Sequence, residues 1–144
     1  MRLLIQRVKN AKCIISSIVH SSIQNGLLVY VAYEETDTFL TIDKALNKVK
    51  KLRIFTDQND KLNLSIDDIS GEVLIISSFT LYADLLNGNR PSFSRSISYD
   101  KSLPLYEYTI EKAKTLFNLK DGVFGADMKI ESINDGPVSV ILDI

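Results

Sequence analysis

Two nearly continuous apolar runs require a β-sheet at the centre of this fold. The first covers residues 27–33 and follows the turn dipeptide Asn25-Gly26, and the second covers residues 73–76. Strands with one solvated face alternate apolar and polar residues, whereas strands buried on both faces are apolar throughout. We therefore predict two buried strands, with residues 27–33 forming a central one.

Further β-rich segments lie at both ends of the sequence. Residues 3–8, 12–16 and 18–23 precede the central strand and are joined by tight turns, which predicts antiparallel neighbours. Two more strands are predicted over residues 128–133 and 138–144. The ends of the chain are thus expected to contribute strands to one antiparallel core.

Two segments have the apolar spacing of amphipathic helices. One helix is predicted from Thr36 or Asp37, as the capping residue, to about Lys51. A second is predicted to be capped by Asp100 or Ser102. With no repeat, linker or low-complexity tract, residues 1–144 are predicted to form a single α+β domain with two main helices.

The composition excludes several classes of protein. The 144 residues include 17 Lys plus Arg and 18 Asp plus Glu, so the chain is not a generally basic nucleic-acid-binding protein. Cys13 is the only cysteine and His20 the only histidine, which excludes an internal disulfide and a cysteine- or histidine-rich metal site. No run reaches membrane-spanning length and no leader is evident, so a soluble cytoplasmic protein is expected.

The sequence changes from apolar to hydroxyl-rich at the end of the second buried run. Ser77, Ser78 and Thr80 follow residues 73–76, and a turn-rich loop over residues 87–93 comes next. A strand that delivers polar side chains and backbone N–H groups into a loop is a common way to build a site. The alternative is that these hydroxyls only cap the strand end.

Familiar catalytic machinery is missing from the sequence. His20 is far from Ser77 in the chain, and no nucleophile elbow or glycine-rich phosphate loop occurs. A site at Ser77–Ser78 would therefore act through hydroxyls, backbone groups and shape. The dipeptide Gly136-Pro137 is a second unusual feature, because proline in a sheet is confined to turns, bulges and edges. The simplest interpretation of that dipeptide is a hairpin turn.

Several short motifs together resemble the D-aminoacyl-tRNA deacylase family, in order and over the whole chain. The motifs are residues 1–8, the strand-end stretch over residues 77–81, residues 89–93, residues 124–128, and residues 134–139 with Gly136-Pro137. Each motif alone is weak, and the combination is highly specific.

The resemblance implies a homodimer with an antiparallel β-sheet core and a site at the dimer interface. It implies hydrolysis of the ester of D-aminoacyl-tRNA, and of Gly-tRNA mischarged on tRNA-Ala, with rejection of L-aminoacyl esters. The partner is the aminoacylated 3′ end of tRNA, and no cofactor, metal or membrane is implied. The resemblance also makes Gly136-Pro137 a cis dipeptide that reaches into the partner's site.

The resemblance also assigns the site residues. Those assigned to catalysis are Thr80, Ser77 and Phe79. Those assigned to substrate binding are Gly136, Pro137, Ser78, Arg7, Phe124 and Ala126, with Arg7 helping to hold the Gly-Pro segment. Backbone N–H groups near Phe79 and Thr80 are expected to hold the developing oxyanion. Either the Thr80 hydroxyl or the ribose 2′-hydroxyl of the tRNA drives hydrolysis, and we favour the latter because an unassisted threonine is a poor nucleophile.

The chain departs from the family pattern at three places. Ser78 stands where glutamine is usual, Ser139 replaces threonine, and Ala32-Tyr33 replaces a pair that contains glycine. Tyr33 is expected to narrow the pocket or to stack on adenine. The Ser78 departure leaves open an alternative function, a catalytically silent module that binds the tRNA 3′ end or a nucleotide. A structural β-rich dimer without a ligand is a third hypothesis.

Overall fold

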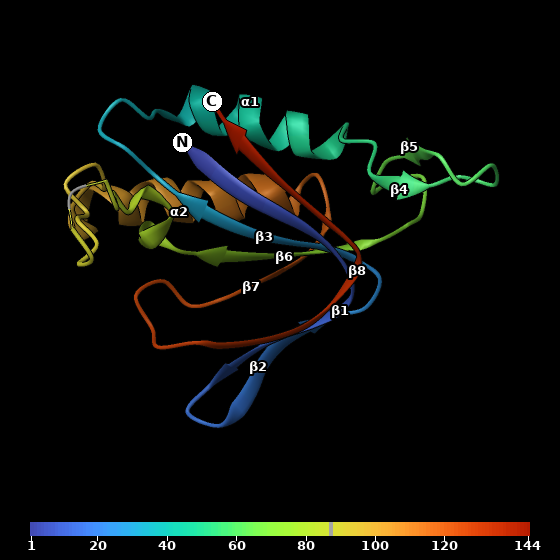
Figure 1. The fold of residues 1–144 in the computed structure, drawn as a ribbon, viewed down its shortest axis with the longest axis horizontal. Coiled ribbons are helices and arrows are strands. Elements are labelled where there is room, and N and C mark those ends of the chain that lie inside the picture. The colour runs from blue at the N-terminus through green and yellow to red at the C-terminus, as the bar shows by residue number, and fades with distance from the viewer. Residues whose placement is uncertain (87) are drawn as a thin grey trace.

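The computed structural model describes residues 1–86 and 88–144, so Asn87 of the predicted loop lies outside the described residues. Figure 1 shows an α+β fold in which α1 and α2 lie on the same side of a curved sheet and the β1–β2 hairpin extends on the other. The elements in chain order are β1 (Arg2–Ile15), β2 (Ile18–Ile23), β3 (Gly26–Ala32), α1 (Phe39–Lys50), β4 (Phe55–Thr56), β5 (Leu62–Leu64), β6 (Glu72–Ser77), the 3₁₀ helix η1 (Phe79–Tyr82), α2 (Tyr99–Lys114), β7 (Asn118–Asp121) and β8 (Lys129–Asp143).

The main sheet is mixed, which corrects the predicted antiparallel core. Its order is β2-β1-β3-β6-β7, and β8 pairs with β1. The β1 pairings are antiparallel, whereas β3–β6 and β6–β7 are parallel. The connections explain the parallel pairs. The chain passes through α1 between β3 and β6, and through α2 between β6 and β7, so each new strand starts at the same end of the sheet as the strand before it.

The sheet is nearly closed on itself. The Ser21 hydroxyl on β2 donates to the Asp121 carbonyl on β7 across 2.8 Å, although these strands stand at opposite ends of the strand order. The two predicted apolar runs form the interior, since residues 27–29 and 73–76 are all buried. The prediction of two buried strands is therefore confirmed.

Both helices begin at residues other than the predicted caps. Thr38 caps α1 and forms a reciprocal capping box with Thr41. Ser98 occupies the cap position of α2 without a side-chain hydrogen bond, so Asp100 lies in the first turn. Phe39 on α1 stacks on Tyr108 of α2 with ring centroids 4.3 Å apart, which holds the helices together.

Strand β8 is continuous over residues that were predicted to form two strands. Gln6 pairs with Ser139 and Val8 with Asn134, so residues 135–138 all lie opposite Arg7. Gly136-Pro137 therefore lies in a bulge of one long strand, and the hairpin turn was the wrong interpretation. Within the described chain, no helix has both the length and the apolar character needed to cross a membrane.

Candidate functional site

A cavity of about 680 Å³ opens where the parallel strands β3 and β6 end. Its walls come from these two strand ends, from η1, from the first turn of α2 and from the segment that leads into β8. Ligands commonly bind beyond the carboxyl ends of parallel strands, because loops and helix starts converge there. The volume falls within the range of about 300–1,000 Å³ that is usual for small-molecule sites.

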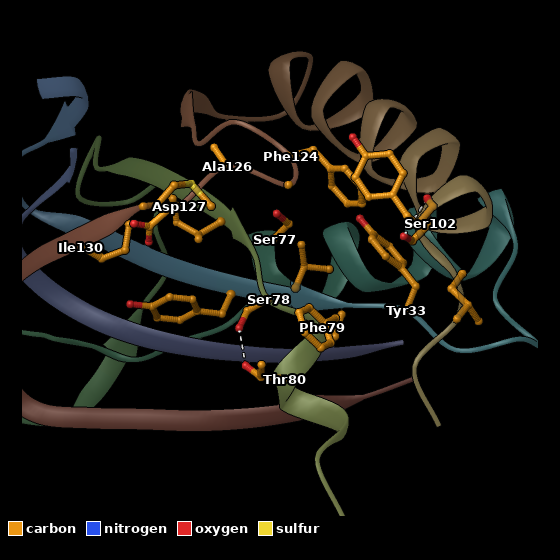
Figure 2. Close-up of a pocket in the computed structure, with 18 residues that line it drawn as sticks. Tyr33, Ser77, Ser78, Phe79, Thr80, Ser102, Phe124, Ala126, Asp127 and Ile130 are labelled. Carbon is orange, nitrogen blue, oxygen red and sulfur yellow. Dashed lines mark hydrogen bonds between the residues drawn. The ribbon is translucent and has the colours of Figure 1, made fainter. Parts of the chain in front are cut away.

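Six of the sequence-predicted site residues line this cavity. They are Ser77, Ser78, Phe79, Thr80, Phe124 and Ala126. Figure 2 shows the first four leaving the end of β6 on one side, with the other two on the opposite wall. The strand-end stretch and the 124–128 motif, which are far apart in the chain, therefore face each other.

The strand-end stretch is held by a small set of hydrogen bonds. The Ser78 amide donates to the Val31 carbonyl at 2.8 Å, and the Ser78 and Thr80 hydroxyl oxygens are 3.0 Å apart. Ser96 donates from its hydroxyl to the Phe79 carbonyl at 2.9 Å. Among residues 1–86 and 88–144, the amides of Phe79 and Thr80 have no acceptor, so both can donate to a ligand.

Tyr33 forms a fixed part of the cavity wall. Its ring is 4% exposed, and its hydroxyl is 2.7 Å from the hydroxyl of Thr109 on α2. Burial raises the pKa of the Tyr33 phenol well above its usual range. Tyr33 thus stays neutral, and its hydroxyl is engaged within the protein at the end of β3.

Several lining residues were missed by the sequence reasoning. Phe124 packs against Tyr99, with ring centroids 5.0 Å apart, and against Tyr106 at 5.2 Å. Gly125 has a φ of +75°, and a Cβ there would lie 2.8 Å from the Tyr99 ring. The only signal in the sequence was Gly125 itself, because glycine is favoured where the backbone takes a positive φ or another group approaches closely. The lining residues that the sequence analysis did not assign to the site are Tyr30, Val31, Ile76, Ile97, Tyr99, Ser102, Gly125, Asp127, Met128 and Ile130.

The described lining contains one carboxylate and no histidine. That carboxylate, Asp127, is 87% exposed and lies 3.1 Å from the Lys129 ammonium. Neither group is held in a buried, hydrogen-bonded arrangement of the kind that tunes a general base. The chemistry available at this cavity therefore comes from hydroxyls and backbone amides.

The remaining predicted residues form a second cluster, outside the cavity of their own chain. Arg7 is 8% exposed and donates to the carbonyls of Asp135 and Ile54, at 3.0 and 2.8 Å. The Gly136–Pro137 peptide bond is cis, and both residues are exposed on β8. Arg7 thus joins the bulge of β8 to the segment before β4.

The comparison with protein families is decisive. A model of the D-Tyr-tRNA(Tyr) deacylase family matches residues 4–143. The chain belongs to this family. Curated family members named D-aminoacyl-tRNA deacylase include one from Pseudoalteromonas translucida, 46% identical with full coverage of both chains. Another from Flavobacterium johnsoniae is 41% identical, covering 99% of this chain and 97% of the relative.

Two solved structures share the fold of this chain. The structure titled "c-Myc DNA Unwinding Element Binding Protein" superposes with a TM-score of 0.94 at 30% identity, covering 100% of this chain and 99% of the other. A structure described as a probable eukaryotic D-amino acid tRNA deacylase gives a TM-score of 0.85 at 16% identity, covering 99% and 98%. At that identity the second structure supports the fold alone.

Proposed function

We propose that this protein is a D-aminoacyl-tRNA deacylase, an enzyme that hydrolyses the ester between a D-amino acid and the terminal adenosine of tRNA. The observation that carries the proposal is the strand-end stretch of Ser77, Ser78, Phe79 and Thr80 along the cavity, in a chain that matches the family over nearly its full length. The substrate, charged tRNA, is found in the cytoplasm, and we assign the enzyme to that compartment.

The amides of Phe79 and Thr80 supply the main chemical contribution. Ester hydrolysis builds negative charge on the acyl oxygen, and both amides lack an acceptor within the described chain. Loss of one such donor typically costs about 2.7–4 kcal/mol of transition-state stabilisation. Two fixed donors are therefore sufficient to explain a substantial rate enhancement without a side-chain base.

The attacking water is activated by the substrate itself. No described residue of the cavity is a histidine, and among the described groups the Thr80 hydroxyl forms a hydrogen bond only with Ser78. A threonine without a base is a weak nucleophile. We assign activation to the ribose 2′-hydroxyl of the tRNA, and a positioning role to Thr80.

The selection against L-aminoacyl esters comes from a partner subunit in a homodimer. Gly136 and Pro137 are exposed and lie outside the cavity of their own chain, so the surface that they form is available to a second copy. Within the described residues β8 pairs only with β1, and its outward face carries Ile133 and Ile141 at 59% and 68% exposure. An exposed apolar strand surface of this kind is suited to a symmetric contact with the same surface of a second copy.

The preference for D- over L-aminoacyl esters comes from steric exclusion of the L side chain rather than from attraction of the D side chain. The partner's Gly136 and Pro137 occupy the position of an L side chain, so D-aminoacyl esters fit and L-aminoacyl esters clash. A glycyl ester has no side chain to exclude, and Gly-tRNA mischarged on tRNA-Ala is therefore a second substrate.

The chiral claim is tested with purified protein and charged tRNA. The enzyme is expected to release D-tyrosine from D-Tyr-tRNA, to cleave Gly-tRNA(Ala), and to leave L-Tyr-tRNA intact. Equal rates on the D and L esters would contradict the exclusion. Binding of a non-hydrolysable D-tyrosyl-adenosine amide without any turnover of the ester would instead favour a silent binding module.

The shared site is tested by mixing two variants, each of which is expected to be inactive on D-Tyr-tRNA by itself. Gly136→Ala alters the gate, and Ala126→Trp fills the cavity. If each site uses one subunit's cavity and the other's gate, mixed dimers contain one intact site, and about a quarter of wild-type activity returns after random exchange. No recovery, with dimers verified by light scattering, would mean that each chain builds its own site.

A further inference from the structure

The two hydroxyls of the strand-end stretch form a pair whose members are held differently. Ser78 and Thr80 both line the cavity, and Figure 2 shows their hydroxyl groups directed toward each other. The oxygen atoms are 3.0 Å apart, and either hydroxyl is geometrically able to donate. Neither hydroxyl has another partner within the described chain.

Ser78 is the anchored member of the pair. Its amide donates to the Val31 carbonyl at 2.8 Å, and its carbonyl accepts from the Leu81 amide at 3.1 Å. With both backbone groups engaged, the position of the Ser78 hydroxyl depends on a single side-chain torsion. Thr80 is more exposed, and its bond with the Ser78 hydroxyl is the one side-chain hydrogen bond that it forms within the described residues.

The number of hydroxyl protons decides which hydroxyl can donate a hydrogen bond to a ligand. Two hydroxyls carry two protons, and one proton is used between them. When Ser78 donates to Thr80, the Thr80 proton is free to point into the cavity, and its hydroxyl becomes a better donor through the cooperative chain. Without the Ser78 hydroxyl, no hydrogen bond fixes the direction of the Thr80 hydroxyl proton.

We propose that Ser78 is a positioning residue that orients the Thr80 hydroxyl as a donor toward the acyl group of the substrate. The proposal rests on the proposed function, because the acyl group is that of the aminoacyl ester. It gives the serine at position 78, where the family usually has glutamine, a defined role in this chain.

The first test is a double-mutant cycle with D-Tyr-tRNA. Ser78→Ala is expected to lower kcat roughly 2- to 12-fold, the change that one neutral hydrogen bond supports, with KM unchanged. Ser78→Thr, which keeps the hydroxyl, is expected to restore most of the rate. In a Thr80→Ala background, the same Ser78→Ala change is expected to have no further effect. Ser98→Ala is the control, since the Ser98 hydroxyl makes no capping hydrogen bond to α2.

The second test does not need turnover. In protein labelled at threonine methyl groups, three-bond couplings to the Thr80 methyl carbon report its χ1 rotamer. Wild type is expected to show one rotamer, and Ser78→Ala a mixture with unchanged Tm. If wild type hydrolyses no ester but the rotamer still depends on Ser78, the proposed function fails and the positioning remains. Additive kinetic effects, or an unchanged rotamer in Ser78→Ala, would overturn the positioning role.

Discussion

The Tyr33 phenol donates its proton to the Thr109 hydroxyl across 2.7 Å. The direction follows from the neighbouring bond, in which Thr109 gives its only hydroxyl proton to the Leu105 carbonyl at 2.8 Å. This chain of three groups ties the end of β3 to the middle of α2. It fixes the cavity wall at the position where the family usually has a glycine-containing pair.

Removing both polar members of the Tyr33–Thr109 pair is expected to cost less than the sum of the single changes. Tyr33→Phe leaves a buried acceptor unpaired and should destabilise the protein by about 0.5–1.5 kcal/mol, and Thr109→Val leaves a buried donor unpaired at about 1–3 kcal/mol. Urea unfolding of both single variants and the double variant measures the coupling. Strict additivity would show that the two hydroxyls do not interact.

Gly136→Ala is expected to destabilise the bulge of β8. The φ of Gly136 is +122°, and a Cβ there would lie 3.0 Å from both Arg7 Nη2 and Val138 Cγ2. Backbone strain of this kind costs about 1–3 kcal/mol, and here crowding adds to it. Gly88→Ala is the matched control, because Gly88 also has a positive φ, +87°, but nothing lies within 4 Å of its added Cβ. If both variants lose the same free energy of unfolding, backbone strain explains the whole effect and crowding by Arg7 and Val138 contributes nothing.

Arg7 is expected to be replaceable neither by Met nor fully by Lys. Its guanidinium donates to two carbonyls and to the Thr56 hydroxyl, and an ammonium cannot reproduce that planar geometry. Arg7→Met should lower the free energy of unfolding by about 1.5–3 kcal/mol, with Arg7→Lys between it and wild type. Lys12 lies on β1 like Arg7, and Lys12→Met removes its exposed ion pair with Glu131 of β8, which should cost less than about 1 kcal/mol. A loss no larger in Arg7→Met than in this control would contradict the role of Arg7.

Asp143 is expected to make part of the stability pH-dependent. Its hydrogen bonds from Arg2, at 2.7 and 2.9 Å, lower the pKa of the Asp143 carboxyl. A lowered folded-state pKa gives stability that is complete above the ordinary Asp pKa, near about 4, and is lost as the pH falls through the folded value. The stability difference between wild type and Asp143→Asn should therefore shrink in acid. Urea unfolding from pH 7 to pH 2.5 measures it, with Asp60→Asn as control, and a difference that is independent of pH would contradict the pairing.

The buried strands and half of the cavity followed from local sequence, because those signals are continuous. Residues 27–33 and 73–76 are apolar without interruption, and the hydroxyls after Ile76 mark the strand end. Strand β7 gave no comparable signal, since Asn118, Lys120 and Asp121 have low β-propensity. That strand is formed by parallel pairing with β6, a contact that depends on the crossover through α2.

The helix caps and the lining residues on α2 and β8 could not be predicted from local sequence, because tertiary contacts determine them. The Asp37 carboxylate accepts from the Glu34 amide at 2.8 Å, so Thr38 caps the helix instead. Two neighbouring polar residues are nearly equivalent as caps, and the tertiary contact decides between them. Tyr99 and Ile130 meet at the cavity only because α2 and β8 bring them there.

The pairing of β1 with β8 has a consequence for how the protein is made. Leu3 pairs with Leu142 and Ile14 with Lys129, so β1 cannot complete this pairing until β8 has been synthesised. Contacts this distant in sequence raise the contact order and slow folding. Arg7 also meets Asp135 only after β8 has been made, so the bulge with Gly136 is assembled after the β3–β6 pairing that frames the cavity has become possible.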